Sequence, residues 1–291
     1  MRSVIVILMA ASVLLWASAC SKVSFGYRNA PLIAAWWIDD VFDLPEAQHD
    51  AVRAALDDTL RWHSGTPREE LVGLMRSAAA RLAHPLRDAD VEWAFTAMET
   101  HARQVGRHFG EQLADRWPAM SAEALAALDA RLARRRAELA HKRADESAQM
   151  AVKRRTERIV DELEDWFGPL TAAQQVYIAR HAAVRLDERV WQRELARRHA
   201  RLLEILHTRP PQGLATWIAD VRAGRPPEVA DVAARQRTVY RAFWVGLFAR
   251  AEPAQIARAQ SRLTAWADDL AAVAPMPSTL ARRQDADCAT C

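Results

Sequence analysis

Cysteine is scarce in this chain, which argues against a fold held by several disulfides and gives only a weak signal for zinc. Three cysteines occur in 291 residues: Cys20, Cys288 and Cys291. A small disulfide-held domain needs several pairs within its folded body, and a structural zinc site takes four ligands. In an oxidising compartment the Cys288-x-x-Cys291 pair can form a small-loop disulfide. It lacks the βαβ context of a thioredoxin-like motif and a second ligand pair for zinc, and we expect it to lie in a disordered tail without a structural role.

Glycine is also rare, with 9 residues in the whole chain, whereas alanine, leucine, arginine and glutamate are abundant. Glycine costs about 1 kcal/mol relative to alanine inside a helix. In addition, no segment alternates apolar and polar residues as a half-buried strand does. The sequence therefore predicts an all-α fold.

A long apolar run is missing from the chain beyond residue 16. The run from Val4 to Trp16 follows the positive charge of Arg2. It is shorter than the roughly 20 apolar residues that span a bilayer, and it has the length of the apolar region of a signal peptide. We therefore expect residues 1–19 to be a cleaved signal peptide, followed by a chain that does not cross a membrane.

The residues Ala17-Ser18-Ala19-Cys20 resemble the lipobox of bacterial lipoproteins. This resemblance implies lipidation of Cys20 and cleavage before it, and Ser21 resembles the signal that sorts lipoproteins to the outer membrane. Several acyl chains anchor a protein stably, whereas one binds reversibly. An ordinary secretory signal cut after Ala19 is the alternative. We expect a palmitate-bearing lipoprotein on the periplasmic face of the outer membrane, with covalent lipid and no other cofactor.

Charge is almost balanced, with 40 basic and 37 acidic residues. This balance, like the expected compartment, argues against nucleic acid as a partner. One region is locally basic, within a helix that we predict over residues 121–167. Two readings are open: contact with an anionic partner or lipid, and a solvated face stabilised by neighbouring ion pairs; we expect the second. The residues of this candidate basic surface are Arg134, Arg135, Arg136, Arg154 and Arg155.

Prolines and capping residues predict where the helices begin and end. We expect a lipidated tether over residues 20–30, an all-α body over 31–274 and a disordered C-terminal tail over 275–291. The body is predicted to be a helical bundle from which one or two long antiparallel helices project. These are the helices over about 121–167 and 171–207, since neither segment contains an internal proline or glycine. Shorter helices are predicted over 45–63, 66–82, 88–117, 212–223, 228–250 and 253–273.

The segment from Phe25 to Gln48 contains Tyr-x-Asn, a tryptophan pair, two adjacent aspartates and Asp-Leu-Pro-x-x-Gln. It resembles an uncharacterised family of Gram-negative lipoproteins, classed as a domain of unknown function. The resemblance implies topology and location and no catalytic residue. The candidate interaction residues of this segment are Tyr27, Asn29, Trp36, Trp37, Asp39 and Asp40.

The tryptophan pair has two interpretations. The rings rest at a membrane interface or receive a partner, or one of them packs into the core while the carboxylates face water. We expect the second arrangement, because the other tryptophans of the mature chain are spread along it as packing residues are.

A second, fainter resemblance lies at Leu170-Thr171-x-x-Gln174. This motif is similar to helix starts of small periplasmic helical chaperones. A simpler reading is local, because threonine is a good N-cap and a polar residue three positions later closes the capping box.

No motif for catalysis or metal binding is visible. His101 and His108 are seven residues apart, so they can share a helix face with Glu111, but no His-Glu-x-x-His or Cys/His cluster occurs. We therefore expect no enzyme and no metal site. The expected function is a lipid-anchored envelope lipoprotein that binds or scaffolds a protein or envelope component. The alternatives are a periplasmic holdase chaperone and, less favoured, an envelope hydrolase; the partner and the oligomeric state stay open.

Overall fold

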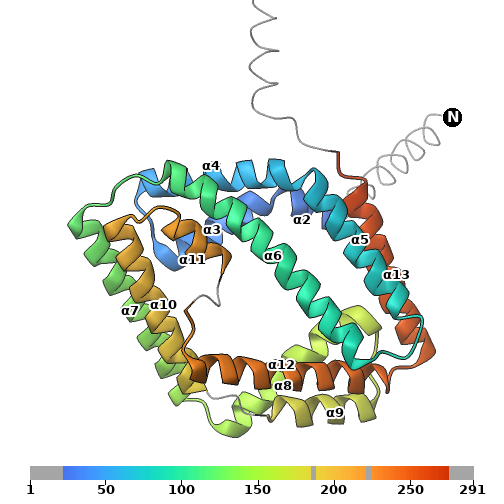
Figure 1. Cartoon of the computed structure of the whole chain (residues 1–291). Coiled ribbons are helices and arrows are strands. Elements are labelled where there is room, and N and C mark those ends of the chain that lie inside the picture. The colour runs from blue at the N-terminus through green and yellow to red at the C-terminus, as the bar shows by residue number, and fades with distance from the viewer. Residues whose placement is uncertain (1–21, 185–187, 221–223, 275–291) are drawn as a thin grey trace, which may run out of the picture.

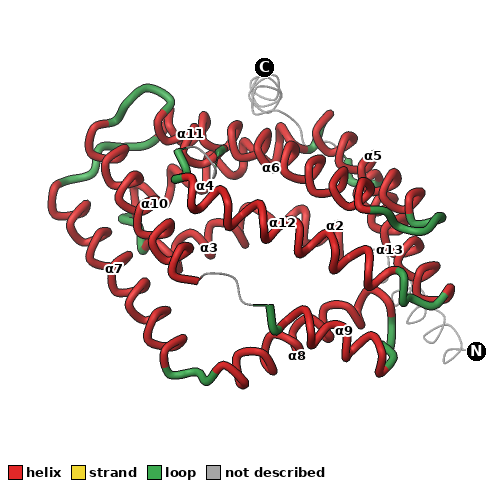
Figure 2. Tube along the Cα trace, turned by 60° about the horizontal axis from the view of Figure 1, so that its bottom comes forward, coloured by secondary structure: helices red, strands yellow, loops and turns green. Residues whose placement is uncertain are grey.

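Every regular element in the described part of the chain is an α-helix, as Figure 2 shows. The computed structural model describes residues 22–184, 188–220 and 224–274. The prediction of an all-α fold is confirmed for these residues. The predicted signal peptide, the lipidation site Cys20 and the tail with Cys288 and Cys291 lie outside them.

The helix boundaries follow the prolines and caps of the sequence. The elements are α2 (Lys22–Arg28), α3 (Ala30–Phe42), α4 (Glu46–His63), α5 (Thr66–Arg81), α6 (Asp88–Arg116), α7 (Ala122–Ala144), α8 (Ala148–Phe167), α9 (Ala172–Ala182), α10 (Glu188–Thr208), α11 (Gly213–Ala219), α12 (Pro227–Phe248) and α13 (Pro253–Ala271).

The helices form the sides of a four-sided frame (Figure 1). In that view α4 forms the top, α5 and α13 the right side, α12 with α8 and α9 the bottom, and α7 with α10 the left side. The longest helix, α6, has 29 residues and crosses the frame as a diagonal. It contacts α4 and α5 at one side and α11 and α12 at the other.

The apolar core of the frame is divided into four clusters, one near each corner. The largest joins α4, α6, α7, α10 and α11 through residues such as Val52, Leu132 and Ile205. A second joins α8, α9, α12 and α13 around Ile178. Two small clusters join α5 to α13 and α10 to α12. The frame is therefore stabilised at its corners.

The prediction of one long helix over residues 121–167 is wrong, because this segment forms two helices. α7 ends at Ala144, and α8 begins after Ser147, whose hydroxyl accepts a hydrogen bond from the amide of Met150 at 3.2 Å. The carboxylate of Glu146 binds Arg154 through two hydrogen bonds of 2.8 and 2.7 Å. A capping serine thus begins a new helix here, although no proline or glycine separates α8 from α7.

The predicted projection of the long helices from the body is also wrong. Leu128 and Leu132 of α7 are buried in the largest core cluster, and α7 contacts α10 and α3.

The segment predicted as one helix over 171–207 contains two, because α9 ends at Ala182 and α10 begins at Glu188.

The expected tether is a docked helix from Lys22 onward. Val23 and Tyr27 of α2 pack against the cluster of Val72 and Leu270. The hydroxyl of Ser24 also donates a hydrogen bond to the carbonyl oxygen of Asp269 at 3.3 Å. The chain is therefore docked on the frame from Val23 onward.

Two glycines bring α6 and α11 into backbone contact. A Cβ atom on Gly110 would lie 2.5 Å from the Cα of Ala215, and one on Gly106 would lie 3.3 Å from the Cα of Ala219. Only hydrogen atoms fit between the two backbones at Gly110. This pair of glycines fixes α11 against the C-terminal half of α6.

Candidate interaction site

Five large apolar side chains lie exposed on α2 and α3. Their exposed fractions are 64% for Phe25, 55% for Leu32, 55% for Ile33, 69% for Trp36 and 61% for Trp37. We call these five residues the N-terminal apolar face. The prediction that one tryptophan of the pair enters the core is wrong.

The opposite side of α3 explains why both rings point outward. Pro31 and Ala35 are buried, and Ile38 and Phe42 pack against the largest core cluster. These positions follow the three- and four-residue spacing of one helix face. Trp36 and Trp37 fall outside that stripe. Small residues thus let α3 approach α4 closely, while its largest side chains remain in contact with solvent.

The two groups of candidate residues meet at the C-terminal end of α3. A guanidinium nitrogen of Arg135, from the candidate basic surface on α7, donates to the carboxylate of Asp40 at 3.0 Å. Another nitrogen of Arg135 donates to the carbonyl oxygen of Asp40 at 3.0 Å. Arg131 binds the carboxylate of Asp43 at 2.9 Å. Asp40 and Asp43, at the acidic end of the interaction segment, are therefore paired with arginines of α7.

The remaining candidates of the interaction segment have local roles. The side-chain amide of Asn29 donates to the carbonyl oxygen of Phe25 at 2.8 Å, at the joint between α2 and α3. The carbonyl oxygen of Asp39 accepts a hydrogen bond of 2.7 Å from the amide of Asp43, which has a left-handed backbone with φ 51°. These contacts shape the two ends of α3.

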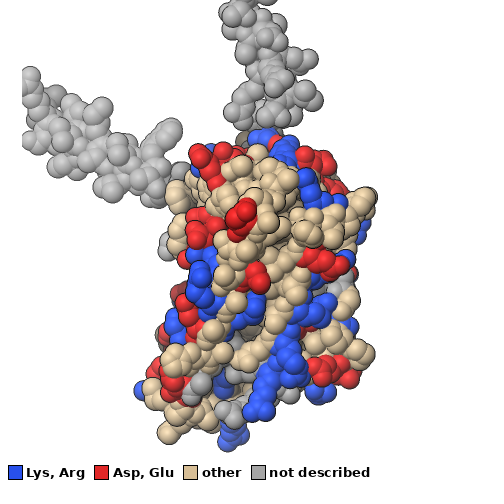
Figure 3. Space-filling model, turned by 90° about the vertical axis from the view of Figure 1, so that its left-hand side faces the viewer, with Lys and Arg blue, Asp and Glu red and all other residues tan. Residues whose placement is uncertain are grey.

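Most of the candidate basic surface is also bound within the chain. Arg136 donates to Nδ1 of His199 at 2.9 Å, and Arg155 donates to the carbonyl oxygen of Ala182 at 3.1 Å. Arg154 binds Glu146, whereas Arg134 is exposed. Figure 3 shows Lys and Arg side chains running down this side of the molecule among Asp and Glu. The arginines join helices as well as facing solvent.

Tyr27 belongs to a buried polar chain that links three helices. Its hydroxyl lies 2.8 Å from Nδ1 of His63 on α4, and Nε2 of His63 lies 3.0 Å from Nε2 of His101 on α6. Burial, followed by the charges of His101 and Arg68, lowers the pKa of His63 to about 4. Burial raises the pKa of Tyr27 to about 12. Burial also lowers the pKa of His101, so all three groups are neutral at pH 7.

The sequence gives no sign that His63 belongs to this hydrogen-bonded series of Tyr27, His63 and His101. His101 was noted only for its spacing from His108 and Glu111, whereas its partner comes from α4, 38 residues earlier. His108 stacks on Trp62, with ring centroids 4.3 Å apart. Among the described residues, no group of three or more His, Cys, Asp or Glu side chains is placed to hold a metal ion.

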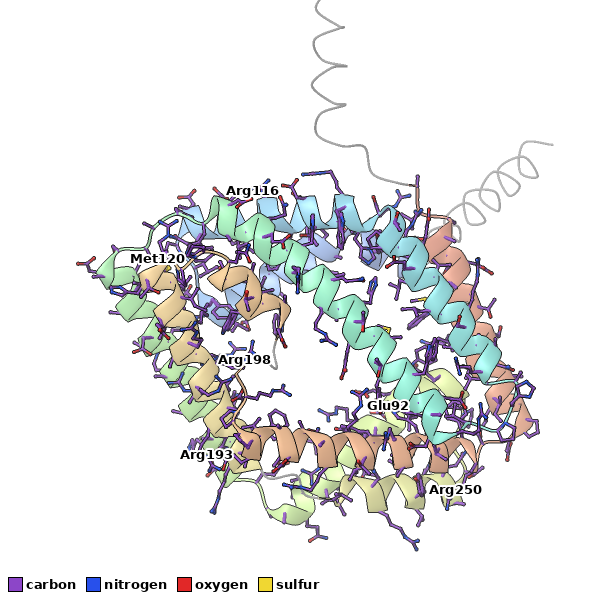
Figure 4. The ribbon with its side chains drawn as sticks, in the orientation of Figure 1. Glu92, Arg116, Met120, Arg193, Arg198 and Arg250 are labelled. Carbon is purple, nitrogen blue, oxygen red and sulfur yellow. The ribbon has the colours of Figure 1, made fainter. Side chains whose placement is uncertain are left out.

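A cavity of about 800 Å³ lies between α6, α10, α11 and α12. Its wall combines aromatic rings with both signs of charge, from Phe95, Glu99, Arg103, Trp191, Arg237 and Tyr240. Beyond the residues that line the cavity, Figure 4 shows Glu92 on α6 beside α12. Arg237 of α12 binds Glu92 at 2.7 Å and Glu99 at 2.6 Å. The hydrogen bond from Arg237, aided by Arg241, lowers the pKa of Glu92 to about 2.

A smaller pocket of about 240 Å³ is bordered by α5, α6, α8, α12 and α13. Its wall is formed mainly by aromatic and aliphatic side chains, among them Trp93, Phe95, Trp166, Phe167, Trp244 and Phe248. The guanidinium carbon of Arg81 lies 4.2 Å from the ring centroid of Trp93 at one edge. This pocket suits an apolar group.

Comparison with known proteins identifies the family of the chain and no individual relative. Among the described residues, no helix combines the length and apolar composition needed to cross a bilayer. Searches of curated proteins and of solved structures gave no significant match. The profile of DUF6279, a family of unknown function, matches residues 40–224, from the end of α3 to the loop before α12. The chain therefore belongs to DUF6279, a family of unknown function.

Proposed function

We propose that the mature chain is a lipid-anchored lipoprotein on the periplasmic face of the outer membrane, and that its frame binds a protein or another envelope component. The motif ending at Cys20 and its position two residues before α2 support the anchor. The proposal includes no catalytic step and no cofactor other than the covalent lipid.

The cavity of about 800 Å³ is the observation that carries the binding role. Aromatic rings and paired charges on one concave surface are typical of sites that receive a ligand or a partner segment. Ala233 and Ala234 of α12 also line the cavity, and they leave room for an incoming side chain. A folded partner of this lipoprotein is thus proposed to insert a segment between α6 and α12.

Photo-crosslinking in cells tests this binding role. A photoreactive phenylalanine analogue replaces Ala234, which is exposed and lines the cavity. The control carries the same analogue at Ala173, an exposed position on α9. We expect a discrete adduct at position 234 and none at 173. Equal adducts at both positions, or none at 234, would contradict binding in the cavity.

Intact mass and membrane fractionation test the anchor. We expect the wild-type protein to carry the acyl mass and to sediment with the outer membrane, and Cys20→Ala to lose both properties. An unlipidated wild-type protein in the soluble fraction would refute the lipoprotein proposal and leave the cavity proposal intact.

A holdase chaperone is the second candidate, and the aromatic pocket of about 240 Å³ favours it. An apolar pocket suits the side chains of an unfolding client. The test is suppression of aggregation of a heat-denatured client, comparing Leu86→Asp at the pocket with Val176→Asp on α9. Holdase activity that is lost only in Leu86→Asp supports this function, whereas an inactive wild type excludes it.

A further inference from the structure

We infer that the N-terminal apolar face, formed by Phe25, Leu32, Ile33, Trp36 and Trp37, lies in the lipid interface and is a second membrane contact beside the acyl anchor. This inference rests on the proposed function for the presence of the membrane. It adds an orientation, because a single flexible anchor would leave the frame free to rotate, whereas a helix face in the lipid fixes which side faces the bilayer.

The composition of the face suits a lipid interface. Each of its five side chains is more than half exposed. Leu32, Ile33, Trp36 and Trp37 follow one another at one- and three-residue steps, so they form a single stripe along α3. Tryptophan is enriched where membranes meet water, because its ring is apolar and its N–H binds polar headgroups. Leucine and isoleucine on the same stripe would lie deeper.

The position of the face along the chain selects lipid as its occupant. Cys20 precedes Phe25 by five residues, and five residues span at most about 17 Å. A lipid-bearing sulfur on Cys20 therefore holds Phe25 close to the bilayer surface. α2 is itself fixed to the frame through Ser24 and Tyr27, so the anchor brings the adjoining α3 with it.

The charges around the face agree with a shallow position. The stripe ends at Asp40, one turn beyond Trp36, and the carboxylate of Asp40 is paired with Arg135 at 3.0 Å. Both side chains keep part of their surface exposed, 51% for Asp40 and 39% for Arg135. A paired, hydrated group of this kind fits among headgroups rather than acyl chains. The N-terminal turns of α3 thus enter the interface, and its C-terminal end leaves it.

Vesicle flotation of the non-acylated chain separates this contact from the anchor. The probe is residues 20–291 carrying Cys20→Ser, mixed with vesicles of phosphatidylethanolamine and phosphatidylglycerol. Trp36→Ser/Trp37→Ser is compared with Met98→Ser/Val176→Ser, whose parent side chains are 51% and 53% exposed on α6 and α9. We expect the tryptophan variant to lower the partition coefficient about tenfold or more, because each indole ring buries a large apolar area.

The control variant is expected to bind vesicles as the parent chain does. A parent chain that does not float, or an equal loss in both variants, would overturn the inference. Circular dichroism identifies any variant that fails to fold. In that case, Trp36→Gln alone against Met98→Gln gives the same comparison with a smaller change.

Labelling of the acylated protein in intact membranes provides the second measurement. A membrane-impermeant maleimide is applied to Ile33→Cys and to Met98→Cys, each in a chain that also carries Cys288→Ser and Cys291→Ser, so that labelling reports on the introduced cysteine. We expect protection at position 33 that is lost when detergent disperses the membrane, and ready labelling at 98. Protection that persists in detergent would mean that a protein or a second copy covers the face, and it would overturn the inference.

The two proposals fail in different ways. If the wild-type protein from cells carries no acyl mass, but vesicle flotation still depends on Trp36 and Trp37, the anchor is refuted and the interfacial face is supported. An acylated chain that is labelled equally at positions 33 and 98 leaves the anchor and refutes the face.

Discussion

The side chains of Gln174 and Gln255 hydrogen-bond to each other where two helices begin, with Nε2 of Gln174 2.7 Å from Oε1 of Gln255. Each glutamine also closes the capping box of its own helix by accepting a hydrogen bond from a backbone N–H. Gln174 accepts from Thr171 at the start of α9, and Gln255 accepts from Glu252 at the start of α13. Both side chains are buried. The Leu170-Thr171-x-x-Gln174 motif, which resembles chaperone helix starts, therefore has a structural role here: it joins two helix N-termini.

Replacing Gln174 by leucine is expected to lower the free energy of unfolding by about 1–3 kcal/mol, because it leaves buried partners without hydrogen bonds. These partners are the backbone N–H of Thr171, the backbone carbonyl oxygen of Arg250 and the side-chain oxygen Oε1 of Gln255. Urea denaturation measures the change. Gln175→Leu, at the exposed neighbouring position, is the control and should change stability little. Equal effects of the two variants would contradict the structural role.

Gly110→Ala is expected to loosen α11 from α6. The new methyl group would lie 2.5 Å from the Cα of Ala215, and overpacking of this kind costs about 1–3 kcal/mol. Gly73→Ala on α5 is the matched control, because a Cβ there meets nothing within 4 Å. That variant should gain about 0.5–1 kcal/mol from helix propensity. Hydrogen exchange of the α11 amides and denaturant unfolding measure both changes; stabilisation by Gly110→Ala would refute the close contact.

Stability is expected to fall as the pH is lowered from 6.5 towards 4. The pKa of His63 is about 4 in the folded chain and 6.5 when unperturbed, so the unfolded chain binds more protons in this range. The groups facing His63 are Tyr27, His101 and Arg68, and Arg68 opposes its protonation. Urea midpoints at pH 7 and pH 5 should differ less in His63→Gln than in the wild type. The exposed His141→Gln should keep the wild-type difference.

Glu92→Gln is expected to weaken the contact between α6 and α12 by on the order of 1 kcal/mol, because 38% of the Glu92 side chain remains exposed to solvent. Arg237 and Arg241 both bind this carboxylate. Its pKa is lowered to about 2, so the wild-type contribution is present above pH 4.5 and is lost as the pH falls towards 2. Thermal unfolding at pH 7 compares Glu92→Gln with the control Glu111→Gln, which changes an exposed position on α6. Equal melting temperatures for the two variants would contradict this role of Glu92.

Local signals in the sequence predicted most helix boundaries, whereas contacts between helices decided the site. Pro45, Pro227 and Pro253 mark the starts of α4, α12 and α13, because proline fits a first turn and interrupts a preceding helix. The outward position of Trp36 was missed because α4 selects which face of α3 is buried. His63 was missed because only the packing of α4 on α6 brings it to His101.

The four corner clusters have a consequence for how the molecule deforms. In a fold with one central core, opening any side exposes the whole interior, and unfolding is a single cooperative event. Here each corner holds its own apolar contacts, so we expect one corner to open while the other corners keep their packing. Amide exchange should accordingly resolve separate opening free energies for separate corners. If the proposed binding role holds, the opening of one corner would admit a large partner segment to the cavity at the expense of one cluster rather than of the whole fold.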